Sequence, residues 1–200
     1  MIIGEHMSES IVVLTLDQIR RIYRERMTGD FPKNELKSLK VIEESMERGL
    51  YIGYGCCDGA EILAYALFVR LGRHALLDYY AVRADLRDQG LGSRFLQALI
   101  AGPMREMDCV LLEVDDVDRA PDEAERKRRV WRLQFYLRNG LKVTDVCATT
   151  YGADFRILAL PVGAQMDAQT ISRVYSAIYR ELLPARVYDE EVEIRISPVP

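Results

Sequence analysis

The chain contains 200 residues, of which 49% are hydrophobic, and its formal net charge is −4 at pH 7. This length suits one domain, or one domain with an appendage, and the hydrophobic share can fill a core of ordinary size. The acidic balance argues against a general nucleic-acid-binding protein, and no apolar run approaches the roughly 18 residues of a membrane span.

Cysteine and histidine usage limits the site chemistry and the compartment. The cysteines, Cys56, Cys57, Cys109 and Cys147, form no Cys-x-x-Cys pair, and only 2 histidines are present. These counts argue against a zinc centre, so we expect no metal. Free thiols are typical of a reducing cytosol, and residues 1–10 lack the order of a signal peptide, so we expect a cytoplasmic protein.

The first predicted elements are a short strand and two amphipathic helices. The strand is predicted over residues 11–14. Thr15 and Gln18 have the spacing of a capping box, which predicts a helix that residues 28–32 then break. A second helix follows and ends at Gly49. Its apolar face holds Leu36, Leu39, Ile42 and Met46.

The middle of the chain predicts three successive strands, a turn and a helix. Asp58-Gly59 is typical of a hairpin turn between the first two strands. The helix is indicated by Leu91, Phe95 and Leu99, which repeat every four residues. The strands are predicted over residues 50–57, 62–71 and 75–82, and the helix over residues 91–101.

The next segment predicts a strand, a long helix and a strand pair. Pro121 suits the first turn of a helix that reaches Arg138, and Asn139-Gly140 ends that helix. The strands are predicted over residues 109–114, 141–149 and 155–160.

The C-terminal residues 166–200 predict a helix and a strand beyond this core. Apolar residues at helical spacing run from Ile171 to Leu182, and residues 192–196 alternate apolar and charged. That strand adds either to the edge of its own sheet or to a partner's sheet, which leaves a homodimer open. The element order predicts an α+β fold, with a mixed central sheet flanked by helices and a C-terminal helix-strand extension.

The turn Arg87-Asp88-Gln89-Gly90-Leu91-Gly92 is the most informative stretch of the chain. It joins a strand to a helix, so the free N–H groups of the first helical turn point outward with the positive end of the helix dipole. Gly90 and Gly92 carry no side chain that would block a phosphate. Phe95 stands where the dinucleotide fingerprint needs its third glycine, and no P-loop lysine follows. Without further context, such a turn is a tight connection with no ligand about as often as it is an anion-binding site.

Residues 76–82 together with this turn resemble the acyl-CoA-binding segment of the GNAT (GCN5-related) N-acetyltransferase superfamily. In that family the turn cradles the CoA pyrophosphate, and the preceding strand hydrogen-bonds the pantetheine arm. The element order over residues 11–161 resembles the GNAT order as well. The resemblance implies acetyl-CoA as the acyl donor, held by Ala81, Val82, Arg87, Asp88, Gln89, Gly90, Leu91, Gly92 and Ser93.

A second resemblance concerns Tyr136, which is followed by Gly140-Leu141. The run is similar to the Tyr-x-x-x-Gly-Phe at the end of the fourth GNAT helix, where the tyrosine hydroxyl lies beside the CoA sulfur. This implies that Tyr136 is the acid that protonates the leaving thiolate, for which a phenol has a suitable pKa range. Periodicity alone would favour a core aromatic residue. Many GNAT proteins carry an asparagine seven residues earlier, where this chain has Arg129.

Two carboxylates interrupt predicted strands and are candidate bases. Glu113 lies in a Leu-Glu-Val run similar to that of the superfamily's ribosomal-protein N-terminal acetyltransferases, where the glutamate is the base. A buried carboxylate is costly unless it is paired or faces a cleft, so its pKa is expected to rise. Asp78 is the second candidate, expected on the same face as Tyr80 and Val82. Either carboxylate could instead pair with an arginine, and water could relay the proton.

Two charge clusters flank these candidates. Asp115, Asp116 and Asp118 either attract a cationic amine or form a solvated loop. A basic run on the next helix either helps to hold the CoA 3′-phosphate or forms an exposed face with i,i+4 partners. This run comprises Arg126, Lys127, Arg128, Arg129 and Arg132.

Together these features predict an acetyl-CoA-dependent N-acetyltransferase that moves an acetyl group to a primary amine, on a small molecule or a peptide, by direct attack in a ternary complex. The alternatives are a longer acyl donor, or a non-catalytic CoA-binding sensor or assembly module. No nucleic-acid or membrane partner is expected. We expect the acetyltransferase domain over residues 11–165, the extension over 166–200, and an N-terminal segment over 1–10 that could be partly non-native. Loops 28–32 and 151–154 would select the acceptor.

Overall fold

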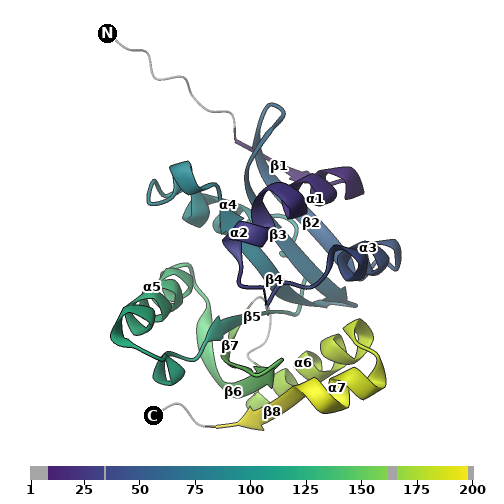
Figure 1. Cartoon of the computed structure of the whole chain (residues 1–200), viewed down its shortest axis with the longest axis vertical. Coiled ribbons are helices and arrows are strands. Elements are labelled where there is room, and N and C mark those ends of the chain that lie inside the picture. Colours follow the sequence, from purple (N-terminus) through teal and green to yellow (C-terminus); the bar gives the residue numbers. More distant parts are fainter. Residues whose placement is uncertain (1–8, 34, 162–165, 198–200) are drawn as a thin grey trace.

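The computed structural model describes residues 9–33, 35–161 and 166–197. Its strands form one mixed sheet in the order β1-β2-β3-β4-β5-β7-β6-β8 (Figure 1). Only β4 and β5 are parallel among the described neighbours, and the remaining pairs are antiparallel. The strands are β1 (Ser10–Val13), β2 (Tyr51–Asp58), β3 (Glu61–Leu71), β4 (His74–Val82), β5 (Cys109–Asp115), β6 (Lys142–Thr150), β7 (Ala153–Pro161) and β8 (Val192–Ile196).

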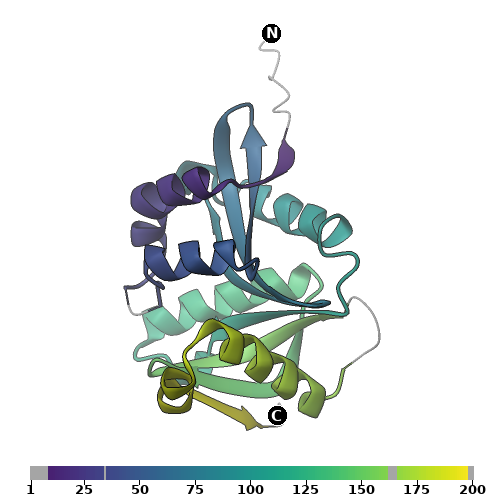
Figure 2. The ribbon, with the colours of Figure 1, turned by 90° about the vertical axis from the view of Figure 1, so that its right-hand side faces the viewer.

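Helices cover both faces of this sheet. In Figure 1, α5 lies on one side of the lower strands, and α6 and α7 lie on the other. Figure 2, viewed from the α6 side, places α6 in front of those strands. The helices are α1 (Leu16–Ile22), α2 (Thr28–Asp30), α3 (Leu39–Glu47), α4 (Leu91–Ala101), α5 (Glu123–Arg138), α6 (Ala168–Leu182) and α7 (Ala185–Glu191), with a π-helical turn η1 (Tyr23–Met27) and short 3-10 turns η2 (Ala84–Leu86) and η3 (Val117–Arg119).

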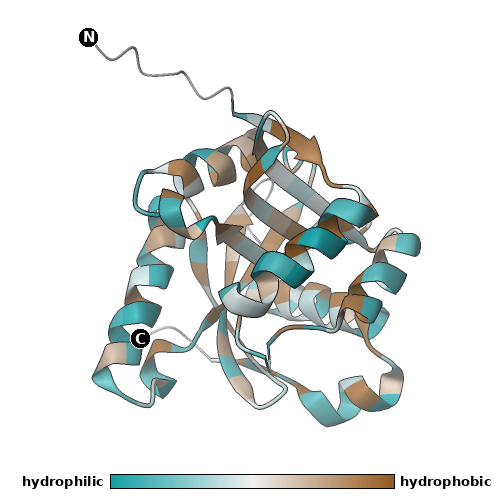
Figure 3. Cartoon of the chain, turned by 45° about the horizontal axis from the view of Figure 1, so that its top comes forward, coloured by the Kyte–Doolittle hydropathy of each residue, from teal (hydrophilic) through white to brown (hydrophobic). Residues whose placement is uncertain are grey.

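The sheet separates two hydrophobic cores. One core holds Ile19 of α1, Ile42 of α3 and Tyr175 of α6 against one face of the strands. The other holds Phe95 of α4 and Tyr136 of α5 against the opposite face. Strands are mostly hydrophobic and helices alternate hydrophobic and hydrophilic residues (Figure 3), as expected when each helix buries one stripe against a sheet that is covered on both faces.

Local signals explain where several helices begin. The capping box is confirmed: Gln18 N donates to Thr15 Oγ1 at 3.3 Å and Thr15 N donates to Gln18 Oε1 at 2.8 Å. The predicted break at residues 28–32 is wrong in its first part, because helical structure continues through η1 and α2 to Asp30. Pro121 does not occupy the first turn of α5. It precedes Asp122, whose side chain caps the helix by accepting from Glu125 N at 2.7 Å.

The C-terminal extension returns to the sheet of its own chain. β8 pairs antiparallel with β6, from Val146 opposite Ile196 to Thr150 opposite Val192. The short helix α7, which the sequence did not predict, lies between α6 and β8 and begins after Pro184. Among the described residues no helix is long and apolar enough to cross a membrane.

Candidate active site

The central strands part halfway along their length. β4 and β5 pair in parallel from His74 opposite Cys109 to Leu77 opposite Leu112. Beyond these pairs β4 stays with β3 up to Val82, and β5 stays with β7 up to Asp115. The two strands therefore leave backbone groups facing a gap in the middle of the sheet, where a ligand can satisfy them.

A β-bulge marks the fork. Leu77 pairs with Phe68 and Tyr79 pairs with Leu67, so Asp78 is an extra residue on β4. The bulge shifts the alternation of side chains by one position. Asp78 consequently contacts Lys37 and Tyr51 on the side of the core that contains Tyr79. The expectation that Asp78 shares a face with Tyr80 and Val82 is wrong for this reason, because those two residues pack in the opposite core.

A cavity of about 1030 Å³ opens at the fork. On one side it reaches the glycine turn and α5, and on the other it reaches the loop before α3, the β6–β7 turn at Tyr151 and the end of α6. Gln89 and Leu91 do not line it: Gln89 donates to Asp85 O at 2.9 Å, and the Leu91 side chain is buried in the core. The predicted site residues in its wall are Asp78, Ala81, Val82, Arg87, Asp88, Gly90, Gly92, Ser93, Glu113 and Tyr136.

The glycine turn presents the N-terminus of α4 to this cavity. Gly90 has φ +77° and, as the N-cap, supplies no side-chain hydrogen bond to the first turn. The N–H groups of that turn are therefore available to a ligand. A Cβ at Gly92 would lie 3.3 Å from Val82 Cγ2, so a side chain here would fill the space between the turn and β4. The hydroxyl of Tyr80 donates to Gly92 O at 2.5 Å and fixes the turn against the strand.

Arg87 ties the turn to the other side of the cavity. Its Nε donates to Val82 O at 3.1 Å, and its terminal nitrogen donates to Asp30 at 2.7 Å. Asp30 also accepts from the Tyr65 hydroxyl at 2.9 Å. The guanidinium is therefore oriented by β4 and α2 while it remains half-exposed at the cavity wall.

Tyr136 lies near the C-terminal end of α5 in the wall of the cavity. Its ring packs edge-on against Phe135, with centroids 5.1 Å apart. No described residue hydrogen-bonds to its hydroxyl, which leaves that group available to a ligand. Burial raises the pKa of Tyr136 to about 12, with Arg132 opposing the rise, so the phenol stays protonated at neutral pH.

Glu113 is the first residue of β5 beyond the last pair with β4. Tyr179 donates to Glu113 Oε1 at 2.6 Å, and Tyr175 donates to the same oxygen. Burial raises the pKa of Glu113 above its ordinary value, Lys37 and the tyrosine hydrogen bonds lower it, and Asp78 adds to the rise. A carboxylate whose pKa is moved toward neutrality can accept a proton near physiological pH.

Asp78 is engaged much more fully than Glu113. Lys37 Nζ lies 2.8 Å from Oδ1 and 3.0 Å from Oδ2, and the Tyr51 hydroxyl donates to Oδ2. The side chain of Asp78 is 3% exposed and that of Lys37 is 13% exposed. Burial would lower the pKa of Lys37, but Asp78 and neighbouring tyrosines raise it well above its usual value, so this is a buried ion pair.

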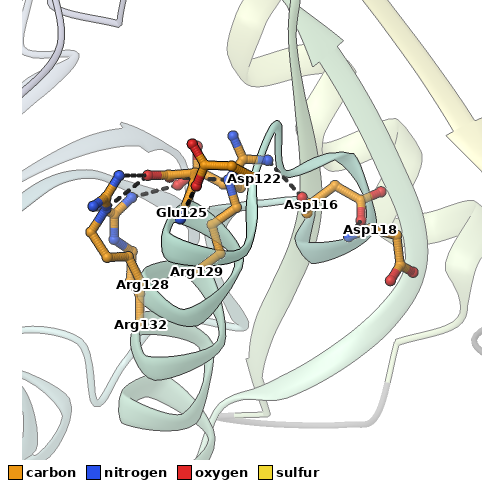
Figure 4. A network of polar contacts seen from close by, with 8 residues as sticks. Asp116, Asp118, Asp122, Glu125, Arg128, Arg129 and Arg132 are labelled. Atoms are coloured by element: carbon orange, nitrogen blue, oxygen red, sulfur yellow. Dashed lines mark hydrogen bonds and ion pairs between the residues drawn. The ribbon is translucent and has the colours of Figure 1, made fainter.

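Several residues of the acidic loop and of the basic face of α5 are engaged in local contacts (Figure 4). Asp116 accepts from Asp118 N at 3.0 Å, and its carbonyl accepts from Arg129 at 2.7 Å. Glu125 pairs with Arg128 and Arg129 at helical spacing. Only part of each cluster reaches the cavity: Asp115, which pairs with Arg132 at 2.5 Å, and Lys127, Arg128 and Arg132.

Several residues of the cavity wall carry no local signal in the sequence. Glu35 and Lys37 lie in the loop between α2 and α3, and Tyr179 reaches the cavity from α6. Trp131, the single tryptophan, is 59% exposed on α5 at the cavity wall. Of these residues only Trp131 has a signal in the sequence, since a tryptophan within a strongly charged helical segment is unusual. Among the described residues no group of three or more histidine, cysteine, aspartate or glutamate side chains could hold a metal ion.

Residues 16–123 match the family model described as the acetyltransferase (GNAT) family. Because this match covers more than half of the 200 residues, the chain belongs to the GNAT family of acetyltransferases. No curated protein matches the chain.

Solved structures share the fold at low sequence identity. A GNAT-family protein from Bacteroides thetaiotaomicron is 22% identical with a TM-score of 0.63, over 86% of this chain and 95% of its own. The ribosomal-protein-S18-alanine N-acetyltransferase of Escherichia coli is 22% identical with a TM-score of 0.58, over 80% and 97%. A Bacillus subtilis acetyltransferase in complex with CoA is 15% identical with a TM-score of 0.53, over 76% and 98%.

Proposed function

We propose that this chain transfers the acetyl group of acetyl-CoA to a primary amine by direct attack in a ternary complex. One observation carries the proposal: a single cavity joins the uncapped start of α4, the free hydroxyl of Tyr136 and the Glu113 carboxylate. These are an anion cradle, an acid and a base, which are the groups that acyl transfer from a thioester to an amine needs. The free buried thiols fit a cytoplasmic location.

The residues present fit CoA. The first-turn N–H groups of α4 and the glycines of the turn would take the pyrophosphate. The edge of β4 around Ala81 and Val82, where β5 no longer pairs, would take the amide groups of the pantetheine arm, beside the Val82 carbonyl that accepts from Arg87 Nε. Lys127 and Arg138 lie in the cavity wall without an ion-pair partner among the described residues, and they would meet the remaining phosphate. Bound acetyl-CoA would supply the reactive thioester.

The protein's own groups would then move two protons. Glu113 would accept a proton from the acceptor's ammonium group, directly or through water, and so generate the attacking amine. Tyr136, protonated at neutral pH, would donate its proton to the departing sulfur. Asp78 is the weaker candidate for the base because Lys37 engages both of its oxygens.

The decisive test is release of free CoA. The protein is incubated with acetyl-CoA and a panel of polyamines, amino sugars and peptides with free N-termini, and the thiol product is measured. At least one amine should give stoichiometric release of CoA and an acetylated product of matching mass. Tight acetyl-CoA binding without transfer to any amine class would contradict the enzyme and favour a CoA-binding module.

We expect the acceptor to be cationic in solution. Glu35 and Glu113 line the cavity without a cationic partner among the described residues, whereas Asp30, Asp78 and Asp115 are paired with arginine or lysine. Raising the ionic strength from about 0.1 to about 1 M shortens the Debye length from about 10 to about 3 Å. KM for the acceptor should therefore rise more than KM for an uncharged analogue.

The prediction of a cationic acceptor can also be tested by substitution at constant ionic strength. Glu35→Gln should raise KM for the acceptor by about 5-fold, the size of a partly exposed charge pair, and leave KM for acetyl-CoA unchanged. Glu47→Gln, an exposed carboxylate of α3 outside the cavity, is the matched control. An anionic best substrate, or equal KM in both variants, would refute the cationic acceptor.

Neutralising Glu113 should affect the rate of catalysis, whereas neutralising Asp78 should affect the stability of the fold. Glu113→Gln should lower kcat by roughly 10²-fold and remove the acidic limb of the pH–rate profile, because that limb reports loss of the carboxylate as pH falls through its raised pKa. Asp78→Asn should instead lower the free energy of unfolding by about 3 kcal/mol, since it leaves Lys37 buried without its partner. If Asp78→Asn is stable but has a strongly reduced kcat, and Glu113→Gln has a nearly wild-type kcat, the assignment of Glu113 as the base would be reversed in favour of Asp78.

A further inference from the structure

Two tyrosines of the C-terminal extension reach the candidate base. Tyr175 and Tyr179 are one helical turn apart on the buried face of α6 and are 0% and 2% exposed. An ionised carboxylate can only accept hydrogen bonds, so both hydroxyl groups must donate to Glu113. Both donate to the same oxygen, Oε1.

The other oxygen of Glu113 is left open. No described residue hydrogen-bonds to Oε2, which is not fully buried, and Glu113 lies in the cavity wall. The tyrosines therefore hold the carboxylate by Oε1 and leave Oε2 with free lone pairs. A general base needs this arrangement: a fixed direction and one oxygen free to accept a proton.

Burying the hydroxyl groups of Tyr175 and Tyr179 is unfavourable unless they hydrogen-bond to Glu113. The neighbouring core positions of α6 are apolar, at Ile171, Val174 and Ile178. Phenylalanine would fill the same space as each tyrosine, and burying a hydroxyl without a hydrogen bond destabilises the folded protein. Glu113 is the hydroxyl partner of both residues in the described structure, so the chemistry of this pair is directed at the carboxylate.

Resting on the proposed function, we infer that Tyr175 and Tyr179 are positioning residues for Glu113, and that the C-terminal extension thereby completes the acetyltransferase site. Both lie outside the part of the chain that matches the family model, residues 16–123. Tyr175 does not line the cavity and reaches the site through its hydrogen bond to Glu113, whereas Tyr179, whose ring it contacts, also contributes to the cavity wall.

Removing either tyrosine hydroxyl should shift the pKa of Glu113 in a defined direction. Hydrogen bonds to an ionised carboxylate stabilise the charged form, so removing one raises the pKa of Glu113 further. A hydrogen bond to a charged group corresponds to a pKa change of about one unit or more. The other groups that interact electrostatically with Glu113 are unchanged in such variants. They are Lys37, Asp78, Glu35 and Tyr79.

The test uses Tyr175→Phe and Tyr179→Phe, which keep both rings. NMR titration of isotope-labelled glutamate side chains, with Glu113→Gln identifying the resonance, should show the pKa of Glu113 raised by about one unit in each variant. The acidic limb of the pH–rate profile should move upward by the same amount. Tyr188→Phe, a buried tyrosine of α7 whose hydroxyl contacts Ser176, should change neither.

A second measurement separates positioning from packing. In a Glu113→Gln background, Tyr175→Phe should change kcat no further, because the group through which it acts is gone. An unchanged pKa of Glu113 in both tyrosine variants, or a shifted pKa with an unmoved acidic limb, would overturn the inference. Failure of the proposed function is a different result: wild-type protein would then acetylate no amine, while the NMR titration would still show whether the tyrosines hold Glu113. The two single variants keep the test decisive if one of them does not fold.

Discussion

Gly90→Glu is expected to abolish acetyl-CoA binding while the protein stays folded. The new carboxylate would project from the N-cap of α4, where the free N–H groups are proposed to take the pyrophosphate. At an effective dielectric constant of 20, two unit charges 4 Å apart repel by about 4 kcal/mol, which corresponds to about 1000-fold in affinity. Titration calorimetry with acetyl-CoA should therefore detect no binding.

Two further variants separate the effect of the new charge on acetyl-CoA affinity from the effect of backbone strain at residue 90. A side chain at φ +77° is strained by about 1–2 kcal/mol whatever its charge. Gly59→Glu introduces the same charge at φ +57° in the β2–β3 turn, with no atom within 4 Å of the new Cβ, and should bind acetyl-CoA like the wild type. Gly90→Ala should keep most of the affinity. Undiminished affinity in a folded Gly90→Glu protein would remove the basis of the cofactor site.

Local sequence signals predicted the parts of the fold that depend on neighbouring residues. The capping box at Thr15 and the glycine turn before α4 are set by hydrogen bonds and φ values within a few residues. The bulge at Asp78 is different, because Leu77, Asp78 and Tyr79 read as an ordinary strand. The extra residue becomes visible only in the register with Phe68 and Leu67 of β3.

The same distinction applies to the candidate site. Tyr136 and Glu113 could be proposed because short runs around them resemble GNAT motifs. Tyr175 could not, because its apolar neighbours on α6 predict only a buried face, and its hydroxyl partner Glu113 is 62 residues away in sequence. Lys37 is a similar case, since its ion pair spans 41 residues. Contacts between distant elements therefore determine which polar residues of the cavity act together.

Tyr136→Phe tests the proposed acid most directly. The change removes one hydroxyl, which has no hydrogen-bond partner among the described residues, and keeps the ring against Phe135. If Tyr136 protonates the departing sulfur, kcat should fall by roughly 10²-fold or more with little change in acetyl-CoA affinity. Stability should hardly change, because no intramolecular hydrogen bond is lost.

Tyr54→Phe is the control for this experiment. Tyr54 lies in the same core, is equally buried and has no hydrogen-bonded hydroxyl among the described contacts, but it does not line the cavity. It should keep wild-type turnover. Because the pKa of Tyr136 is raised to about 12, the phenol stays protonated through the neutral range, and on the alkaline side the rate of the wild type should fall as pH rises toward that value. The alkaline limb should be absent in Tyr136→Phe. A folded Tyr136→Phe protein that matches Tyr54→Phe in kcat would end the assignment of Tyr136 as the acid and leave the cofactor site standing.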